Sequence, residues 1–411
     1  MKKIIYCYML LLTVVIPVHG QTLEEYLLMA AENNPDIQAA HSEFNAALQR
    51  IAQVNALPDP TVSLGVFVSP IETRVGAQRA RLSLNQMFPW FGTLKAWEEA
   101  AGLMAQAKFG EINVLKNDLF LALKQNYFPL AEIKEHIHIS EENLEILQTY
   151  KLLSTAKYSN GKVPLSDVLR VDIMIENLRT EISLLRENIK PYEVNINRLL
   201  NRSDSLSIHI EPRFTQGLTG IDSEPIEDLV NRNPSLLLVD AKIEAEKANE
   251  NLAKLRYKPN LGVGLDYAMI SKRKGVEMAQ NGKDVLMPMV SLSLPIFKKK
   301  NAAYVEESKL MQMSLSQKRE GIENKLKGSY AMAFFELEKA LELFQHYQNQ
   351  IEKNKRIQNL LYTAYANSGE NFEEVLRIQQ ETLRYEVAKA TATKNYYLSL
   401  AKLESLTASD L

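Results

Sequence analysis

The sequence predicts an α+β membrane protein in which a long α-helical coiled-coil barrel joins a shared transmembrane β-barrel, with four strands from each protomer. Three observations predict this class: an internal duplication, alternating apolar runs long enough to cross a bilayer as tilted strands, and helices too long for a compact domain. The duplication is visible in recurring landmarks, since Asn34-Pro35 returns as Asn233-Pro234 and other landmarks keep nearly the same spacing. Each half of the chain is therefore expected to be one structural repeat.

The N-terminus has the features of a secretory signal peptide. Lys2 and Lys3 give it a positive start, and a mostly apolar run then ends at Pro17, before small residues that suit a cleavage site. The run is too short for a comfortable membrane-spanning helix. The predicted boundaries are a signal peptide at 1–20, a first repeat at 21–203, a linker at 204–223 and a second repeat at 224–411.

Each repeat contains two runs in which apolar side chains alternate with small or polar ones. Val62, Leu64 and Val66, for example, fall on one face of a strand, and this alternation predicts a β-hairpin with one half-buried face. Four strands cannot close a barrel, which needs about eight to be filled, and open strand edges are not viable in lipid. Either the hairpins form small soluble sheets, or several copies of the chain pool their strands. The predicted hairpins span 60–89 and 259–296, with loops at about 69–78 and 268–285.

Helices account for the rest of each repeat. The first helix is expected to bend at the Asn-Pro pair, because a residue before proline disfavours the helical conformation. From Gly92 to about Lys157 only Pro129, where a kink is expected, opposes a helix, and some 65 helical residues would be roughly 100 Å long. Short turns are predicted to reverse the long helices at tips 159–166 and 367–373. The first return helix has a strict heptad seam, which predicts supercoiled packing; its positions are Val168, Val171, Ile175, Leu178, Ile182, Leu185, Ile189, Tyr192, Ile196 and Leu199.

Charge and composition argue against several classes of function. The 48 basic and 50 acidic side chains nearly balance, and no basic stripe with interleaved aromatics points to nucleic acid. Cys7 is the only cysteine and lies in the predicted signal peptide, so no disulfide or thiolate metal site is expected in the mature chain. His136 and His138 lack the spacing of a helical metal pair, and methionines are more typical of packed interiors than of a soft-metal path. We expect no enzyme, cofactor or metal site.

Four short segments, taken in order, carry a resemblance over essentially the whole mature chain. They are Asn-Asn-Pro-Asp-Ile at 33–37, Gln-Met-Phe-Pro-Trp-Phe-Gly at 86–92, Gly-Lys-Val-Pro-Leu-Ser-Asp-Val-Leu at 161–169 and Ser-Leu-Pro-Ile-Phe at 293–297. In this arrangement the chain resembles the TolC family of bacterial outer-membrane efflux channels. The resemblance implies a homotrimer whose pooled strands form a barrel in the outer membrane and whose helices form a periplasmic tunnel.

The same resemblance implies a function and partners. The protein would be the passive exit duct of a tripartite efflux system, joined at its tips to a periplasmic adaptor protein and an inner-membrane pump, with the RND type expected. Small toxic compounds or metal cations are the expected substrates. Two alternatives stay open: a periplasmic coiled-coil structural or tethering protein, and the exit duct of a type I protein secretion system.

The family also implies where the narrow end of the channel lies. Acidic residues of the second-repeat tip form a cation-attracting ring there, and the matching stretch contains Glu373 and Glu374. Arg377 stands where a second acid is expected, and it could pair with either glutamate at helical spacing and partly neutralise the ring. The alternative is that these are solvated charges that complement the dipole at a helix start.

Two further groups of residues are assigned on the same basis. Exposed tip turns on rigid helices suit adaptor contacts, although their glycine and proline could serve only to make the turn. Aromatic residues near strand ends suit the girdles at membrane interfaces, although simple packing against helix ends is nearly as good an explanation. The tip residues are Gly161, Lys162, Pro164, Asp167, Gly369 and Glu370, and the aromatic residues are Phe67, Trp90, Tyr267 and Phe297.

Overall fold

The computed structural model describes residues 22–210, 218–220, 226, 231–275, 277–368 and 372–408. The predicted signal peptide at 1–20, and Gly369 and Glu370 of the second tip, lie outside these residues. The helices are α1 (Leu23–Asn33), α2 (Pro35–Val54), α3 (Thr93–Ser159), α4 (Leu165–Leu199), α6 (Pro234–Leu255), α7 (Lys298–Ser368) and α8 (Phe372–Thr407). None of the helices in the described ranges combines the length and apolar character that crossing a membrane requires.

The chain folds into two compact units that do not coincide with the two sequence repeats. One unit contains Met1–Glu32, Ala122–Gly220 and Glu338–Leu398, and the other contains Asn33–Leu121, Ile221–Leu337 and Ser399–Leu411. Each unit therefore combines segments of both repeats. The long helices α3 and α7 each contribute residues to both units.

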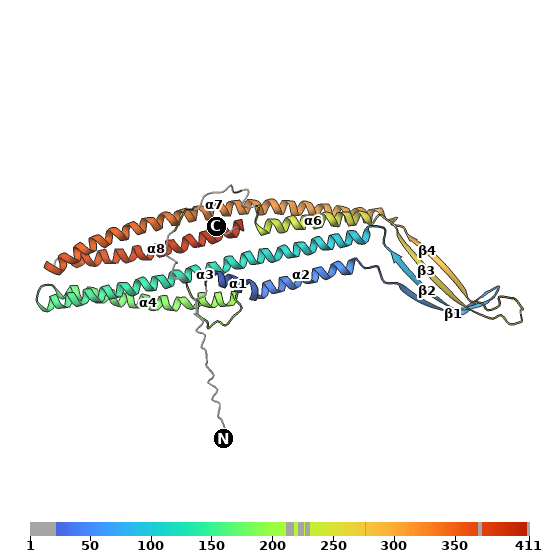
Figure 1. Cartoon of the computed structure of the whole chain (residues 1–411), viewed down its shortest axis with the longest axis horizontal. Coiled ribbons are helices and arrows are strands. Elements are labelled where there is room, and N and C mark those ends of the chain that lie inside the picture. The colour runs from blue at the N-terminus through green and yellow to red at the C-terminus, as the bar shows by residue number, and fades with distance from the viewer. Residues whose placement is uncertain are drawn as a thin grey trace, which may run out of the picture. The chain divides into compact units, whose positions relative to one another are not determined.

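One unit contains a single antiparallel sheet with the strand order β1-β2-β3-β4 (Figure 1). The two hairpins are joined because β2 of the first repeat pairs with β3 of the second, from Ala77 opposite Ser271 to Phe88 opposite Leu261. Alternation within a run predicts the faces of a strand but not its neighbours, so this junction was not predictable from the runs alone. The strands are β1 (Thr61–Thr73), β2 (Gly76–Phe88), β3 (Asn260–Ser271) and β4 (Val285–Ser293).

The strands of the first hairpin are longer, and its loop is shorter, than the sequence predicts. Its loop was expected at about 69–78, but both strands continue to a tight turn at Arg74 and Val75. The register of β1 shifts between Val66 and Ile71, which lets the strand continue beyond the polar residues that suggested a loop. Gly76 closes the turn with φ +128° and leaves no room for a Cβ beside the carbonyl of Ser271.

The two faces of the sheet differ in chemistry. On one face Leu64, Leu82 and Tyr267 stand in register, and large apolar side chains of this face are exposed: Val62 (67%), Leu64 (67%), Val66 (70%) and Val290 (76%). The opposite face carries Ser63, Ser83, Asp266 and Met287 in one register row. The strands β1 and β4 lie at the two edges, each with one paired neighbour.

The Asn-Pro pairs of the two repeats start equivalent helices of this unit. Asn34 has an extended backbone, and its Oδ1 accepts from the backbone N–H of Asp36 (3.0 Å) and Ile37 (3.4 Å) to cap α2. Asn233 caps α6 in the same way, accepting from the N–H of Ser235 at 2.9 Å. An asparagine cap followed by a proline in the first turn explains why a new helix begins after Asn34 and after Asn233.

The unit without the sheet, which contains Ala122–Gly220 and Glu338–Leu398, is a set of long helices that pack through apolar seams. Here α4 returns alongside α3, and α8 returns alongside α7 (Figure 1). Of the ten predicted seam positions in α4, Val168, Val171, Ile175, Leu178, Ile182 and Ile196 are buried and the others are half-buried. Helix α3 continues through Pro129 without ending, so the expected kink there stays a prediction.

Candidate functional site

The helical tip has a buried core built from both repeats. Tyr365 of α7 is fully buried and stacks on Phe372 of α8, with ring centroids 4.3 Å apart. The core around this pair draws on α3, α4, α7 and α8 and consists of Leu147, Tyr150, Val163, Val171, Ile175, Leu178, Ile182, Tyr365, Phe372, Val375 and Leu376. Such a core fixes the exposed residues of the tip on a rigid base.

The first tip turn ends α3 and starts α4 within a few residues. Gly161 adopts φ +69°, the left-handed conformation that glycine tolerates, and its N–H donates to the carbonyl of Tyr158 at 2.9 Å. Pro164 has an extended backbone and caps α4, and the N–H of Asp167 donates to its carbonyl at 3.2 Å. Gly161, Lys162 and Pro164 are exposed and Asp167 is half-buried. Their role as adaptor contacts stays a prediction.

Two contacts join the first tip to the second. The ammonium of Lys157 donates to the carbonyl of Ala366 at 3.0 Å and lies 5.2 Å from the ring centroid of Tyr365. Arg170 of α4 forms an ion pair with Glu373 of α8 at 3.0 Å. Sequence reasoning did not single out Lys157 or Arg170, because their partners come from the other repeat. Glu373 is thus paired across the tip and not with Arg377.

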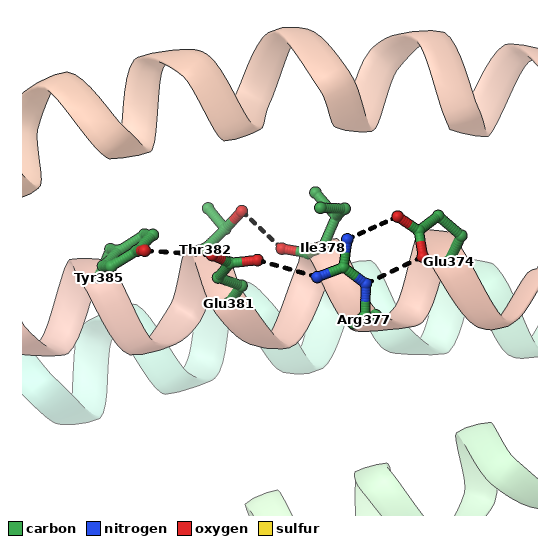
Figure 2. A network of polar contacts seen from close by, with 6 residues as sticks. All are labelled: Glu374, Arg377, Ile378, Glu381, Thr382 and Tyr385. Carbon is green, nitrogen blue, oxygen red and sulfur yellow. Dashed lines mark hydrogen bonds and ion pairs between the residues drawn. The ribbon is translucent and has the colours of Figure 1, made fainter.

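Arg377 lies at the centre of a charged row on α8 (Figure 2). Its Nη2 and Nε donate to the two carboxylate oxygens of Glu374 at 2.6 and 2.9 Å, and its Nη1 donates to Glu381 at 3.4 Å. Glu381 also accepts from the hydroxyl of Tyr385 at 3.1 Å. The guanidinium lowers the pKa of the Glu374 carboxyl, and the pKa of Arg377 is raised in return. Of the two acids predicted at the constriction, each therefore has an arginine partner.

Burial perturbs two groups beneath this row. The pKa of Asp167 is raised because burial disfavours its charge, which Arg170 opposes and Glu373 reinforces. Burial also raises the pKa of Tyr365 to about 12, with a further contribution from Asp167. Both shifts favour the neutral form of the group over its charged form.

The four predicted interface aromatics occupy different places on the sheet. Phe297 is 76% exposed and Trp90 is half-buried against Phe91, and both follow the ends of strands. Tyr267 falls on the apolar face, where its hydroxyl donates to Asp284. Phe67 follows Val66 at the start of the stretch where the register of β1 shifts, so the strand pairing does not assign its face. The interface roles of all four stay predictions.

The sheet also holds an ion pair that sequence reasoning missed. Arg81 of β2 donates to a carboxylate oxygen of Asp266 on β3, at the junction of the two repeats. Asp266 is 2% exposed, and its second oxygen has no hydrogen-bond partner among the described residues. The available signal was an acid on the same strand face as Gly262 and Gly264, since a charge there needs a partner from a neighbouring strand.

Comparison with known proteins finds a protein family that matches part of the chain. Residues 27–202 match the family model described as Outer membrane efflux protein. The match falls within the first of the two sequence repeats. This match agrees with the outer-membrane location predicted from the sequence.

Individual relatives are distant in sequence, and a solved structure is similar in fold. The chain is similar to the pyoverdine export outer membrane protein OpmQ of Pseudomonas putida, with 21% identity over 60% of this chain and 56% of that protein. It is similar to Nodulation protein T of Rhizobium leguminosarum, with 25% identity over 44% of this chain and 40% of that protein. The chain thus spans about half the length of these curated relatives. The open-state MtrE outer membrane channel of Neisseria gonorrhoeae superposes with a TM-score of 0.73 at 16% identity, over 94% of this chain and 88% of that chain.

Proposed function

We propose that this protein is the outer-membrane channel of a tripartite efflux system. Three copies form a passive duct that extends into the periplasm, where the tips bind an adaptor protein that connects to an inner-membrane pump of the RND type. The duct exports small toxic compounds or metal cations. One relative is named for the export of pyoverdine, which supports export across the outer membrane.

The observation that carries this proposal is the four-stranded sheet. One face is apolar and exposed, the other is polar, and β1 and β4 each have an unpaired edge in the single chain. A sheet of this kind is not viable alone in lipid, because unpaired backbone groups have no water to bind. Pairing β4 of one copy with β1 of the next removes every edge. Three copies then supply twelve strands, which exceeds the roughly eight that a closed barrel needs.

The tips supply the narrow end and the docking surface. Glu373, Glu374 and Arg377 line the constriction, where the arginine contacts already described reduce its negative charge. The adaptor binds the first tip turn, at Gly161, Lys162, Pro164 and Asp167, together with Gly369 and Glu370 of the second. A rigid buried core beneath these residues supports both roles.

Conductance in a planar lipid bilayer tests the proposal. The purified oligomer, with its mass measured in detergent, should insert and give discrete conductance steps. Glu374→Ala should change the step size or the ion selectivity, whereas Glu352→Ala, a matched change at an exposed position of α7, should not. A folded trimer that never conducts would refute the channel. Conductance that both variants leave unchanged would keep the channel and remove Glu374 from its constriction.

A further inference from the structure

A concentration of positive charge lies at one end of the sheet, where the β1–β2 turn and the β3–β4 loop meet. The strand ends and the residues that connect them, within 72–79 and 272–284, carry six exposed basic residues against three exposed acids. The basic residues are Arg74, Arg79, Lys272, Arg273, Lys274 and Lys283, and the acids are Glu72, Glu277 and Asp284. We call this set of six basic residues the basic rim.

The two segments of the basic rim are held together as one surface. The N–H of Gly282 in the long loop donates to the carbonyl of Val75 in the short turn at 2.6 Å. Within the long loop, Asn281 accepts from the N–H of Arg273 at 2.8 Å and donates to its carbonyl at 2.9 Å. Arg79 donates to the hydroxyl of Ser271 at 3.2 Å. The basic side chains are therefore presented by a hydrogen-bonded surface.

The charge of the basic rim is not balanced within the chain. None of its six members takes part in an ion pair with another described residue. The nearby Asp284 forms its hydrogen bonds outside the basic rim: its carboxylate accepts from the N–H of Ile270 at 2.8 Å and from the hydroxyl of Tyr267. Six exposed basic residues in two adjoining segments, without ion-pair partners among the described residues, give a local excess of positive charge that an external anion can balance.

The basic rim borders the apolar face of the sheet. On that face, Val66 (70% exposed) and Met269 (42% exposed) stand in one register row toward this end of the sheet. Basic residues directly beyond an apolar band lie where lipid headgroups would be, and each one near an anionic lipid surface strengthens binding. We propose that the basic rim binds phosphate-bearing lipid headgroups of the membrane leaflet that surrounds this end of the sheet. This inference rests on the proposed function, since it requires the apolar face to lie in a membrane.

Lipid binding by the purified oligomer in a non-ionic detergent tests the inference. Diphosphoryl lipid A, its dephosphorylated form and inorganic phosphate are the probes, and native mass spectrometry counts bound lipid. The rim variant changes Lys272, Arg273 and Lys274 to glutamine, and its matched control changes Lys318, Lys325 and Lys353 of α7, all exposed and without a described ion pair. The rim variant should bind diphosphoryl lipid A about 10- to 100-fold more weakly than wild type, and the control should bind it like wild type.

Three outcomes would overturn the inference. In the first, wild type binds the dephosphorylated lipid as tightly as diphosphoryl lipid A. In the second, the rim variant binds diphosphoryl lipid A as tightly as wild type does. In the third, inorganic phosphate at a concentration similar to that of the lipid displaces it, which would indicate a site for free anions. Bilayer conductance of the same preparations separates this inference from the function on which it rests. Pores that show no phosphate-dependent lipid binding would refute only the inference, whereas folded protein that forms no pores would refute the function.

Discussion

Removing Arg81 should destabilise the protein far more than neutralising the carboxylate with which it pairs. Asp266 is 2% exposed and has Arg81 as the partner of one oxygen, while its other oxygen has none among the described residues. The Arg81 side chain is 44% exposed and can be hydrated without its partner. Arg81→Met therefore leaves a buried carboxylate with no counter-charge, whereas Asp266→Asn leaves an arginine that still reaches water.

The asymmetry can be given a magnitude. Breaking a buried ion pair by removing one partner costs about 3–5 kcal/mol when the remaining charge stays buried. Asp266→Asn keeps an oxygen that accepts from Arg81, so the loss is closer to that of one ordinary hydrogen bond, about 1 kcal/mol. The two variants should thus differ by about 2–4 kcal/mol. The double variant Arg81→Met/Asp266→Asn should recover most of what Arg81→Met loses, because the buried charge is gone.

Urea unfolding of the purified protein in one fixed detergent measures these differences. The chain has two tryptophans, Trp90 directly after β2 and Trp97 in the first turns of α3, so intrinsic fluorescence reports on the unit that contains the sheet. Equal losses in the two single variants would refute the reasoning. A double variant as unstable as Arg81→Met would refute it as well, since the cost could not then come from the unpaired carboxylate.

The remaining predictions concern the tip. Arg377→Gln should increase the preference of the channel for cations, because Glu374 and Glu381 lose the guanidinium that they share. Arg384→Gln, further along α8, is the control and should have less effect. Reversal potentials under a salt gradient measure both variants. Tyr365→Phe should leave the tip as stable as wild type or about 1 kcal/mol more stable, because the buried hydroxyl has no partner among the described residues. Since the pKa of Tyr365 is raised from 10.0 to about 12, wild type should lose stability as pH rises through that interval, and the variant should lack this loss in unfolding followed by circular dichroism. Ile175→Ala, at 3% exposed, should cost about 2–5 kcal/mol in the same assay, whereas Ile173→Ala, at 61% exposed, should cost little.

The parts of the fold that could be predicted from the sequence are those specified by local physics. Asn34 and Asn233 cap helices through their own side chains, and proline follows each, so both helix starts are visible in four residues. The heptad seam of α4 appears in the spacing of its apolar residues, and Val171 is fully buried as that spacing requires. These signals depend on neighbours within one or two helical turns.

The rest depended on contacts between distant segments. The pairing of β2 with β3 joins residues from different repeats, and alternation alone assigns faces without assigning neighbours. Polar residues after Val68 suggested a loop, but a shift in register lets β1 continue to Thr73. At the tip, helical spacing allowed Arg377 to pair with either of two glutamates, and the choice is settled by Arg170, which takes Glu373 from the other repeat.

The presence of Arg377 at the proposed constriction follows from the duplication. Asp167-Val168-Leu169-Arg170 of the first tip and Glu374-Val375-Leu376-Arg377 of the second are the same acid-x-x-arginine segment, with the valine buried in both. Arg377 is therefore the expected repeat partner of Arg170, and its presence needs no separate explanation as a replaced acid. The two arginines differ in use, because Arg170 crosses to α8 to reach Glu373 while Arg377 stays on its own helix and bridges Glu374 to Glu381. Both uses offset negative charge at the start of α8, so the charge of the proposed constriction depends on the two repeats together and cannot be deduced from the second tip alone.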